Sequence, residues 1–358
     1  MDSGLENVVA AETALSDVRG DIGELIIKGW YVEKLAATMA YEDVTHLLWQ
    51  SAFEDLSTIQ ELGNRLGDAR AQAFDKLPNT DATIDTIQYL RMGWAAQQDD
   101  ESLETAVKLA SSGLVYTAAA VRSAKGLAPI KPDSSLSSSA DFLRMITGTA
   151  PHADKARALD AYFVTICDHG LNASTFAARV VSSTRAGLTS AVLGGVSALK
   201  GPLHGGAPGP VLDMFDDIGE AGNAEAWIDA ALARGDRLMG FGHRVYRARD
   251  PRADALKAAA GRLAGTAGRI AFAEHIEREV LGKLRRKYPN RPLETNVEFY
   301  TAILLEALEI PREAFTSVFA CGRVLGWIAH AREQISEGRI VRPKSVYRGP
   351  VPELAGAN

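Results

Sequence analysis

The sequence predicts an all-α protein, a multi-helix fold with one small β-hairpin near its N-terminus. Apolar residues recur at helical spacing from Tyr31 onward. Only residues 7–30 combine strand-forming side chains with a turn-rich stretch. The chain shows no βαβ alternation, no heptad series and no internal repeat, which excludes parallel α/β sheets, coiled coils and solenoids.

The hairpin comes first along the chain. Residues 8–15 and 24–30 are the expected strands, because they carry most of the apolar and β-branched side chains of this region. Residues 16–23 lie between them and contain serine, two aspartates and two glycines, which are typical of turns. The sequence therefore predicts a hairpin whose turn covers residues 16–23.

A series of helices follows, separated by breaks rich in proline, glycine and serine. Asn223 is the expected N-cap of one helix, and Gly235 is expected to end it. The expected helices cover residues 43–49, 56–74, 84–97, 103–125, 139–147, 153–168, 173–183, 186–200, 210–218, 223–235, 252–263, 267–286, 295–308 and 311–337. Residues 339–358 contain three prolines and are expected to be extended.

Two domains are the expected organisation of a 358-residue chain. Residues 210–315 are the candidate second domain, since glycine- and proline-rich turns lie where it begins and ends. The first domain then comprises residues 1–209 and 316–358. The helix at 186–200 is almost entirely small and apolar, so it is expected to be buried at the centre of the protein or at an interface.

The composition is that of an ordinary soluble protein, 46% hydrophobic and 23% charged with a net charge of −6. This charge argues against nucleic acid or a membrane surface as a partner. No apolar run is long enough to predict a membrane span, and the N-terminus lacks a signal-peptide core. Cys167 and Cys321 lie in apolar helical contexts, which indicates buried, reduced thiols in a cytoplasmic protein.

Two histidines in glycine-rich turns are the first candidate functional residues. His204 is preceded by Gly-Pro-Leu and followed by two glycines, and His243 follows Gly-Phe-Gly. Glycine beside a histidine allows a sharp bend or the close approach of a ligand, which a structural histidine seldom needs. We therefore expect both imidazoles to face a substrate. The seven histidines show no metal-ligand spacing, and neither a nucleophile elbow nor a phosphate-binding loop is present.

Other candidate residues are charged or polar groups at segment ends and within apolar helices. Arg323 lies in an apolar stretch and needs an anionic partner, because burying a lone charge is very costly. Arginines near histidines indicate a small polycarboxylate ligand. A carboxylate with two imidazoles suits removal of a proton beside a carbonyl and stabilisation of the enol. The further candidates are His169, Arg252, Glu298, Arg323 and Arg342.

The chain resembles the citrate synthases over essentially its whole length. Several long motifs in the same order make the resemblance specific. They are Gly201-Pro-Leu-His-Gly-Gly206, Gly240-Phe-Gly-His-Arg-Val-Tyr246, Asp250-Pro-Arg252, Asp168-His-Gly-Leu-Asn-Ala-Ser-Thr175, Gly322-Arg-Val-Leu-Gly-Trp-Ile-Ala-His330 and Arg342-Pro-Lys-Ser. The resemblance implies a large and a small helical domain that close over the substrates, with residues 210–315 as the mobile domain on the CoA side.

The resemblance also implies a role for each candidate. His204 corresponds to the histidine that stabilises the enol of acetyl-CoA, and a helix beginning just after it favours a neutral imidazole. His243 corresponds to the histidine that polarises the oxaloacetate carbonyl, and Glu298 takes the place of the catalytic base. The residues implied to bind oxaloacetate and citrate are His169, Arg252, Arg323 and Arg342, with Arg247 near the CoA phosphates.

No metal or other cofactor is implied, because acetyl-CoA is a substrate. A homodimer is implied, in which Arg342 reaches the site of the partner subunit and the apolar helix at 186–200 contributes to the interface. The expected activity is the condensation of acetyl-CoA, oxaloacetate and water to citrate and CoA in the tricarboxylic acid cycle.

One departure from the family pattern affects the chemistry. Glu298 stands where the family has an aspartate, and its carboxylate is one methylene further from the backbone. A displacement of about 1 Å can cost about 10²-fold in rate. Two alternatives therefore remain open beside citrate synthesis. The chain could be a 2-methylcitrate synthase or a broad acyl-CoA synthase, or a weakly active paralogue with a sensing or assembly role.

Overall fold

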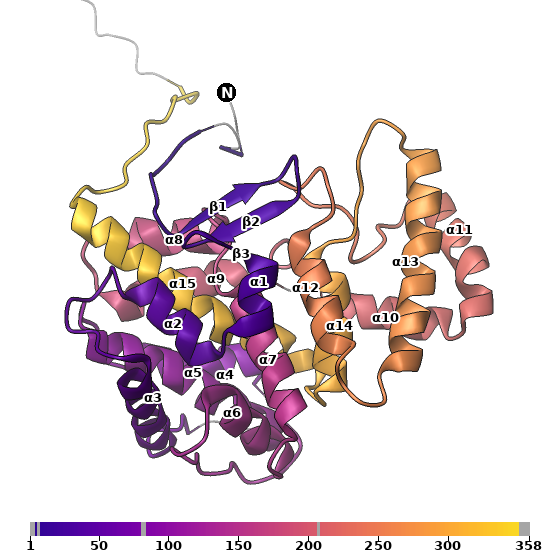
Figure 1. Cartoon of the computed structure of the whole chain (residues 1–358). Coiled ribbons are helices and arrows are strands. Elements are labelled where there is room, and N and C mark those ends of the chain that lie inside the picture. The colour runs from indigo at the N-terminus through magenta and orange to yellow at the C-terminus, as the bar shows by residue number, and fades with distance from the viewer. Residues whose placement is uncertain (1–3, 6–7, 80–83, 206–207, 351–358) are drawn as a thin grey trace, which may run out of the picture.

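The computed structural model describes residues 4–5, 8–79, 84–205 and 208–350, and it confirms the all-α class (Figure 1). The helices are α1 (Val32–Thr38), α2 (Tyr41–Trp49), α3 (Ile59–Phe74), α4 (Thr86–Ala95), α5 (Leu103–Ala124), α6 (Ser138–Thr147), α7 (Ala153–Ile166), α8 (Ala173–Ser182), α9 (Leu188–Leu199), α10 (Pro208–Ile218), α11 (Ala224–Arg234), α12 (Pro251–Ala260), α13 (Ala267–Lys287), α14 (Val297–Ala307) and α15 (Phe315–Glu337). Short 3-10 turns, η1 (Ala221–Asn223) and η2 (Arg312–Ala314), precede α11 and α15. The strands β1 (Ser16–Arg19), β2 (Glu24–Ile27) and β3 (Trp30–Tyr31) form one antiparallel sheet in that order.

The predicted position of the first strand is wrong. Residues 8–15, all of them described, form no strand, and β1 lies inside the stretch expected to be the turn. Arg19 pairs with Glu24, so only residues 20–23 turn. The polar residues of β1 are compatible with a strand because Arg19 forms ion pairs with Asp17 at 2.8 Å and with Glu24 at 3.2 Å.

Side-chain caps begin several of the helices, and glycine ends others. Ser102 and Asn172 accept backbone N–H groups at the starts of α5 and α8, and Gly235 ends α11 in the left-handed conformation. The predicted cap at Asn223 is wrong. The turn η1 intervenes, and the Asn223 amide donates to the Ile218 carbonyl at 3.2 Å instead.

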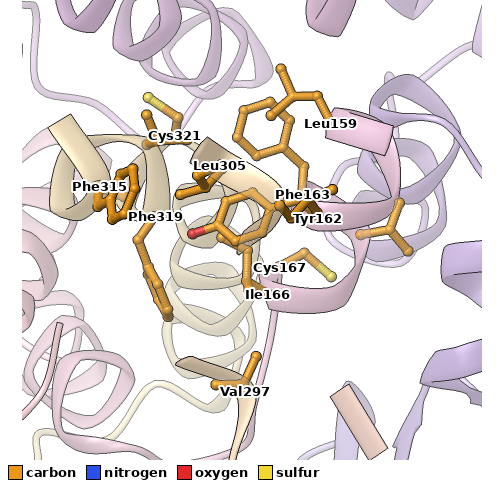
Figure 2. Close-up of a cluster of buried hydrophobic side chains, with 14 of the residues drawn as sticks. Leu159, Tyr162, Phe163, Ile166, Cys167, Val297, Leu305, Phe315, Phe319 and Cys321 are labelled. Carbon is orange, nitrogen blue, oxygen red and sulfur yellow. The ribbon is translucent and has the colours of Figure 1, made fainter. Parts of the chain in front are cut away.

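The helix α15 is the central element of the core, and the side chains from α7, α14 and α15 pack into one apolar cluster (Figure 2). Glycine lets α7 approach α15 closely, since a Cβ at Gly326 would lie 2.3 Å from the Cys167 carbonyl oxygen. The C-terminal end of α7 is therefore held directly against α15. Cys167 and Cys321 are both free and buried, which confirms the predicted thiols.

The helices α10, α11, α13 and α14 lie together on one side of the molecule, and α2 to α9 lie on the other with α15 (Figure 1). The helix α12 contacts α14 and also α1, α7 and β2. The N-terminal hairpin and the end of α7 thereby lie beside the start of α12. No helix in the described part of the chain is long and apolar enough to cross a membrane.

The apolar helix predicted at 186–200 is α9, and it is buried on one face. Gly195 lies against Trp327, where an added Cβ would approach the indole to 2.7 Å. Leu193, Gly194 and Ala198 remain partly exposed. Burial in the core is therefore confirmed for half of the helix, and an apolar strip is left on its outer face.

Candidate active site

The turn between α7 and α8 forms the first part of the site. Gly170 has φ +55°, a conformation that favours glycine. Asn172 then begins α8 by accepting N–H groups from Ser174 and Thr175, both at 3.1 Å. The turn holds His169 at the end of α7 with only 7% of the residue exposed.

The loop before α12 forms the second part. Gly240 and Gly242 both have positive φ, +85° and +82°, which allows the chain to bend on either side of Phe241. The His243 Nδ1 accepts N–H groups from Val245 at 3.0 Å and from Tyr246 at 3.1 Å. A neutral His243 therefore carries its proton on Nε2.

The structure brings His169 and His243 together beside Tyr246. The two imidazole centroids are 5.5 Å apart, and they lie 5.5 Å and 4.8 Å from the Tyr246 ring. The Tyr246 hydroxyl lies 3.2 Å from His169 Nε2. A turn of one segment and a loop of another thus meet through three rings.

His204 lies after α9 and is held by a hydroxyl group. Its Nε2 is 2.9 Å from Ser174 Oγ, which also accepts the indole N–H of Trp327 at 3.1 Å. The same hydroxyl donates its proton to Asn172 Oδ1 at 2.7 Å. Residues 206–207, which complete the glycine-rich motif of this segment, lie outside the described residues.

All three imidazoles are neutral at physiological pH. Burial is the main cause, and it lowers the pKa of His204 and of His243 to about 4 and the pKa of His169 well below its usual value. The positive charges of Arg252 and Arg323 lower the pKa of His169 and His204 further. The two guanidinium groups and the three imidazoles therefore belong to one site.

Arg252 is buried in an ion pair at the start of α12. Its Nε and Nη2 donate to the two oxygens of Asp250 at 3.0 Å and 2.8 Å. Asp250 also accepts the backbone N–H of Arg252 and of Val297, both at 3.1 Å, and so connects α12 to α14. The Arg252 Nη2 lies 3.4 Å from His243 Nε2, a contact between two donors.

Arg323 on α15 is also buried, but the described residues provide no carboxylate to pair with it. Its Nε donates to the Ile166 carbonyl at 2.5 Å, and its guanidinium lies 4.8 Å from the Phe319 ring centroid. Burial lowers its pKa to about 10, although the charge of the Asp168 carboxylate opposes this fall, so the group is still a cation at neutral pH. A buried cation without a carboxylate partner favours the binding of an anion.

Glu298 is the second residue of α14, and its backbone N–H donates to Asn296 Oδ1 at 3.0 Å. Burial raises the pKa of its carboxyl group to about 7, although the charges of Arg252 and Arg237 oppose this rise. Near neutral pH the group is present in both protonation states. That property suits a general base.

Two predicted residues lie outside this cluster. Arg342 is exposed in the segment after α15, and this segment runs away from the body of the chain (Figure 1). Arg247 is also exposed, and its backbone N–H donates to the Gly20 carbonyl at 2.9 Å. The residues that the chain brings together are His169, His204, His243, Arg252, Arg323 and Glu298.

Sequence reasoning missed four residues that position these groups. Tyr246, Ser174, Trp327 and Asp250 all lie inside the motifs that carry the resemblance. Asp250 had a local signal, since an aspartate followed by proline is typical of a helix start. Ser174 and Trp327 had none, because their contact joins α8 to α15.

The assembled groups can bind a small anion and move protons beside its carbonyl groups. The guanidinium groups can pair with carboxylates, and neutral imidazoles can donate to carbonyl oxygens. A carboxyl group with a pKa near 7 can accept a proton. Within the described residues, no group of three or more His, Cys, Asp or Glu side chains is placed to hold a metal ion.

Comparisons with known proteins agree with this chemistry. Residues 4–344 match the family described as citrate synthase, C-terminal domain. The chain is 35% identical to a citrate synthase of Haloferax volcanii over 97% of this chain and 95% of that protein. It is 34% identical to a 2-methylcitrate synthase of Mycobacterium tuberculosis over 97% of this chain and 90% of that protein. The crystal structure of citrate synthase from Thermotoga maritima is similar with a TM-score of 0.87 at 33% identity, covering 99% of this chain and 97% of that one. The chain belongs to the citrate synthase family.

Proposed function

We propose that the protein is an acyltransferase that condenses acetyl-CoA, oxaloacetate and water to citrate and CoA. The observation that carries this proposal is the cluster of two buried guanidinium groups and three neutral imidazoles, of which His169 is buried and the other two are half-buried. Oxaloacetate has two carboxylates and one keto oxygen, and it therefore matches two cations and neutral hydrogen-bond donors. Family membership supports the same reaction.

Oxaloacetate is bound by Arg323, Arg252 and His169. Arg323 has guanidinium N–H groups to spare, since its hydrogen bond to the Ile166 carbonyl uses Nε. His243 donates from Nε2 to the keto oxygen, because its Nδ1 is already occupied by two backbone N–H groups. This bond polarises the carbonyl carbon and places a proton beside the oxygen that becomes an alkoxide.

Acetyl-CoA is activated by Glu298 and His204. The Glu298 carboxylate removes a proton from the acetyl methyl group. The Ser174 hydroxyl donates to Asn172 Oδ1 at 2.7 Å and lies 2.9 Å from Nε2 of His204, and a rotation of the hydroxyl proton toward Nε2 makes that nitrogen the acceptor. The neutral ring then carries its own proton on Nδ1 and donates it to the thioester oxygen of the enol.

The carbon–carbon bond forms between the enol carbon and the keto carbon of oxaloacetate. The new alkoxide takes the Nε2 proton of His243, and the proton that Glu298 removed from the methyl group returns the ring to its neutral state, which yields citryl-CoA. Water then cleaves the thioester and releases citrate and CoA. No resident metal or cofactor takes part in these steps.

We further propose a homodimer in which Arg342 of one subunit completes the site of the other. The exposed position of Arg342 after α15 supports this arrangement, as does the apolar outer face of α9. On neighbouring α8, Phe176 and Val180 are also partly exposed. In α4, which contacts α9, Met92 is 43% exposed. These side chains suit an interface between two copies.

Residues 210–315 are proposed to be the small domain on the CoA side, moving against residues 1–209 and 316–358. The position of Arg247 at the surface suits an interaction with the CoA phosphates. The two free thiols support a cytoplasmic location.

Purified protein mixed with acetyl-CoA and oxaloacetate is expected to release CoA, which a thiol reagent detects. Citrate should appear in equal amount by chromatography. Omission of oxaloacetate is the control for simple thioester hydrolysis. Folded protein that releases no CoA above this control would remove the proposal.

A second candidate function is 2-methylcitrate synthesis from propionyl-CoA, favoured by the identity to the M. tuberculosis enzyme named for it. One methylene is worth only about 1–3 kcal/mol of discrimination, so a direct comparison is needed. A higher kcat/KM for propionyl-CoA than for acetyl-CoA would establish it.

The alternative that the protein is a weakly active paralogue is tested by substitution of Glu298. If the extra methylene of Glu298 limits the rate, Glu298→Asp should increase kcat by about 10-fold or more. A decrease in kcat would show that the backbone of α14 is placed for glutamate.

A further inference from the structure

The N-terminal hairpin contacts both of the segments that present histidines to the site. The Ser16 hydroxyl on β1 donates to Asp168 Oδ2 and accepts the backbone N–H of Gly170 at 3.0 Å. These two residues flank His169 on either side. An added Cβ at Gly170 would lie 3.2 Å from the Val18 side chain, so β1 packs directly on this turn.

Asp168 is fixed from its other side by a buried chain of polar groups. Its Oδ1 lies 3.1 Å from His330 Nε2, and His330 Nδ1 lies 3.1 Å from Arg179 Nη1. Because arginine can only donate, Nδ1 accepts, and Nε2 of a neutral His330 donates to Asp168. Asp168 is thereby held between α15 and β1, and Ser16 supplies the contact from β1.

The turn of the hairpin lies on the His243 loop. The Gly20 carbonyl accepts the backbone N–H of Arg247 at 2.9 Å. An added Cβ at Gly20 would lie 2.4 Å from the Val245 carbonyl oxygen, and one at Gly23 would lie 2.6 Å from the Arg249 carbonyl oxygen. The hairpin thus contacts the chain on both sides of Tyr246, the residue that links the two imidazoles.

We propose that the hairpin is a clamp that sets the separation of His169 and His243, with Ser16 and Gly20 as positioning residues. The inference rests on the proposed function, because the two imidazoles are there to hold oxaloacetate. Neither Ser16 nor Gly20 contacts the reacting groups. The clamp acts through backbone placement, to which orientation-dependent catalysis is very sensitive.

The Ser16 contact is tested with three variants on one strand. Ser16→Ala removes both hydrogen bonds, and we expect about a 10-fold fall in kcat/KM for oxaloacetate with the KM for acetyl-CoA within about twofold of wild type. Ser16→Thr keeps the hydroxyl and should stay within about threefold of wild type on the same principle. Asp17→Ala removes an exposed ion pair of the same strand and should leave both parameters unchanged.

The Gly20 contact is tested by adding a methyl group. Gly20→Ala must displace the His243 loop, and about a 10-fold or larger fall in kcat/KM for oxaloacetate is expected. Gly63→Ala on α3 is the matched control, because the atom nearest to its added Cβ would be 3.7 Å away. This variant should leave kcat/KM for oxaloacetate unchanged. If Ser16→Ala and Gly20→Ala lower activity no more than their controls, the clamp is overturned.

Crystal structures of the same variants test the clamp without any substrate. We expect the distance between the His169 and His243 rings to change in Gly20→Ala and Ser16→Ala, and to stay at its wild-type value in Asp17→Ala and Gly63→Ala. Unchanged rings in both test variants would overturn the proposal. A wild-type enzyme without condensing activity would instead contradict the proposed function, and the crystallographic comparison would still decide whether the hairpin positions the rings.

Discussion

The two buried arginines of the site differ in what balances their charge. On the side of α12 and α14, Arg252 is fixed to both oxygens of Asp250. On the side of α7 and α15, Arg323 bonds a backbone carbonyl, and no carboxylate of the described residues pairs with it. Arg252 is therefore part of the internal structure as well as a proposed ligand contact, whereas Arg323 forms no ion pair with the described residues.

This difference gives Arg252 a structural role in addition to its role in binding. Asp250 joins α12 to α14, so the Arg252 pair also holds the segment that bears Glu298. Arg323 lies in a rigid, buried helix, where its charge is costly until an anion arrives. Substitutions on the two sides should therefore have different effects on folding and on activity.

The largest effect is expected for Arg252→Leu, because it leaves the Asp250 carboxylate buried and unpaired. The free energy of unfolding should fall by about 3–5 kcal/mol, and oxaloacetate binding should be lost with it. Urea unfolding and calorimetry measure the two quantities. The double variant Arg252→Leu, Asp250→Asn should recover stability without binding. Wild-type stability of the single variant would show that the two sides do not differ.

Arg323→Leu should affect activity alone. Loss of charge-assisted hydrogen bonds worth about 1.5–3 kcal/mol each lowers kcat/KM for oxaloacetate on the order of 10²-fold or more. The free energy of unfolding should stay level or rise, because a buried unpaired charge is removed. A melting temperature well below that of the wild type would contradict the contrast with Arg252.

The pH dependence of the reaction should depend on the charges near Glu298, which lie on the side of α12 and α14. The pKa of Glu298 is raised to about 7, so kcat/KM for acetyl-CoA should fall as the pH drops below about 7 and the base becomes protonated. Arg237 lowers this pKa together with Arg252, and Arg237→Gln should therefore move the acid limb to higher pH. Arg323→Leu should leave the limb in place. Measurement of kcat/KM for acetyl-CoA from pH 5 to 9, in the wild type and in both variants, distinguishes these outcomes.

The same carboxyl group affects stability. Its folded-state pKa lies above the usual 4.5, so its contribution favours folding below pH 4.5 and is lost as the pH rises through about 7. Glu298→Gln should therefore be more stable than the wild type above pH 7, and this advantage should disappear at pH 4.5. Urea unfolding at the two pH values provides the check.

The smallest effects concern two tyrosines on opposite sides. The Tyr162 hydroxyl on α7 is buried and has no hydrogen-bond partner among the described residues. The Tyr300 hydroxyl on α14 donates to Glu277 at 2.7 Å. Tyr162→Phe should stabilise the protein on the order of 1 kcal/mol, and Tyr300→Phe should destabilise it by a similar amount. If Tyr162→Phe and Tyr300→Phe change the melting temperature equally, the predicted difference between the two hydroxyl groups is wrong.

Most of the helical fold was predictable because helix formation depends on local spacing and on breaks. The helices α5, α7 and α8 begin at the predicted residues, and their ends differ by one or two positions. The strand β1 was missed because its polar side chains are stabilised by ion pairs of Arg19, along the strand to Asp17 and across the hairpin to Glu24. The Asn223 cap was missed because η1 separates that residue from the first full turn of α11.

The candidate site was predictable in its parts and not in its geometry. Glycines around His204 and His243 marked both residues, and the apolar surroundings of Arg323 indicated a buried cation. Which arginine keeps an internal partner could not be known, although Asp250 lies only two residues from Arg252. That answer depends on how α12 and α14 meet.

The sequence by itself determined the all-α class, the helices and the residue types available for catalysis, because periodicity, caps and motifs act over short stretches of chain. The tertiary structure alone decided which of these groups meet. It placed His169 beside His243, left Arg323 without an ion pair to any described carboxylate, and laid the hairpin across both histidine segments. Such contacts join residues far apart in the chain, and packing of whole helices, which no local pattern records, sets their distances.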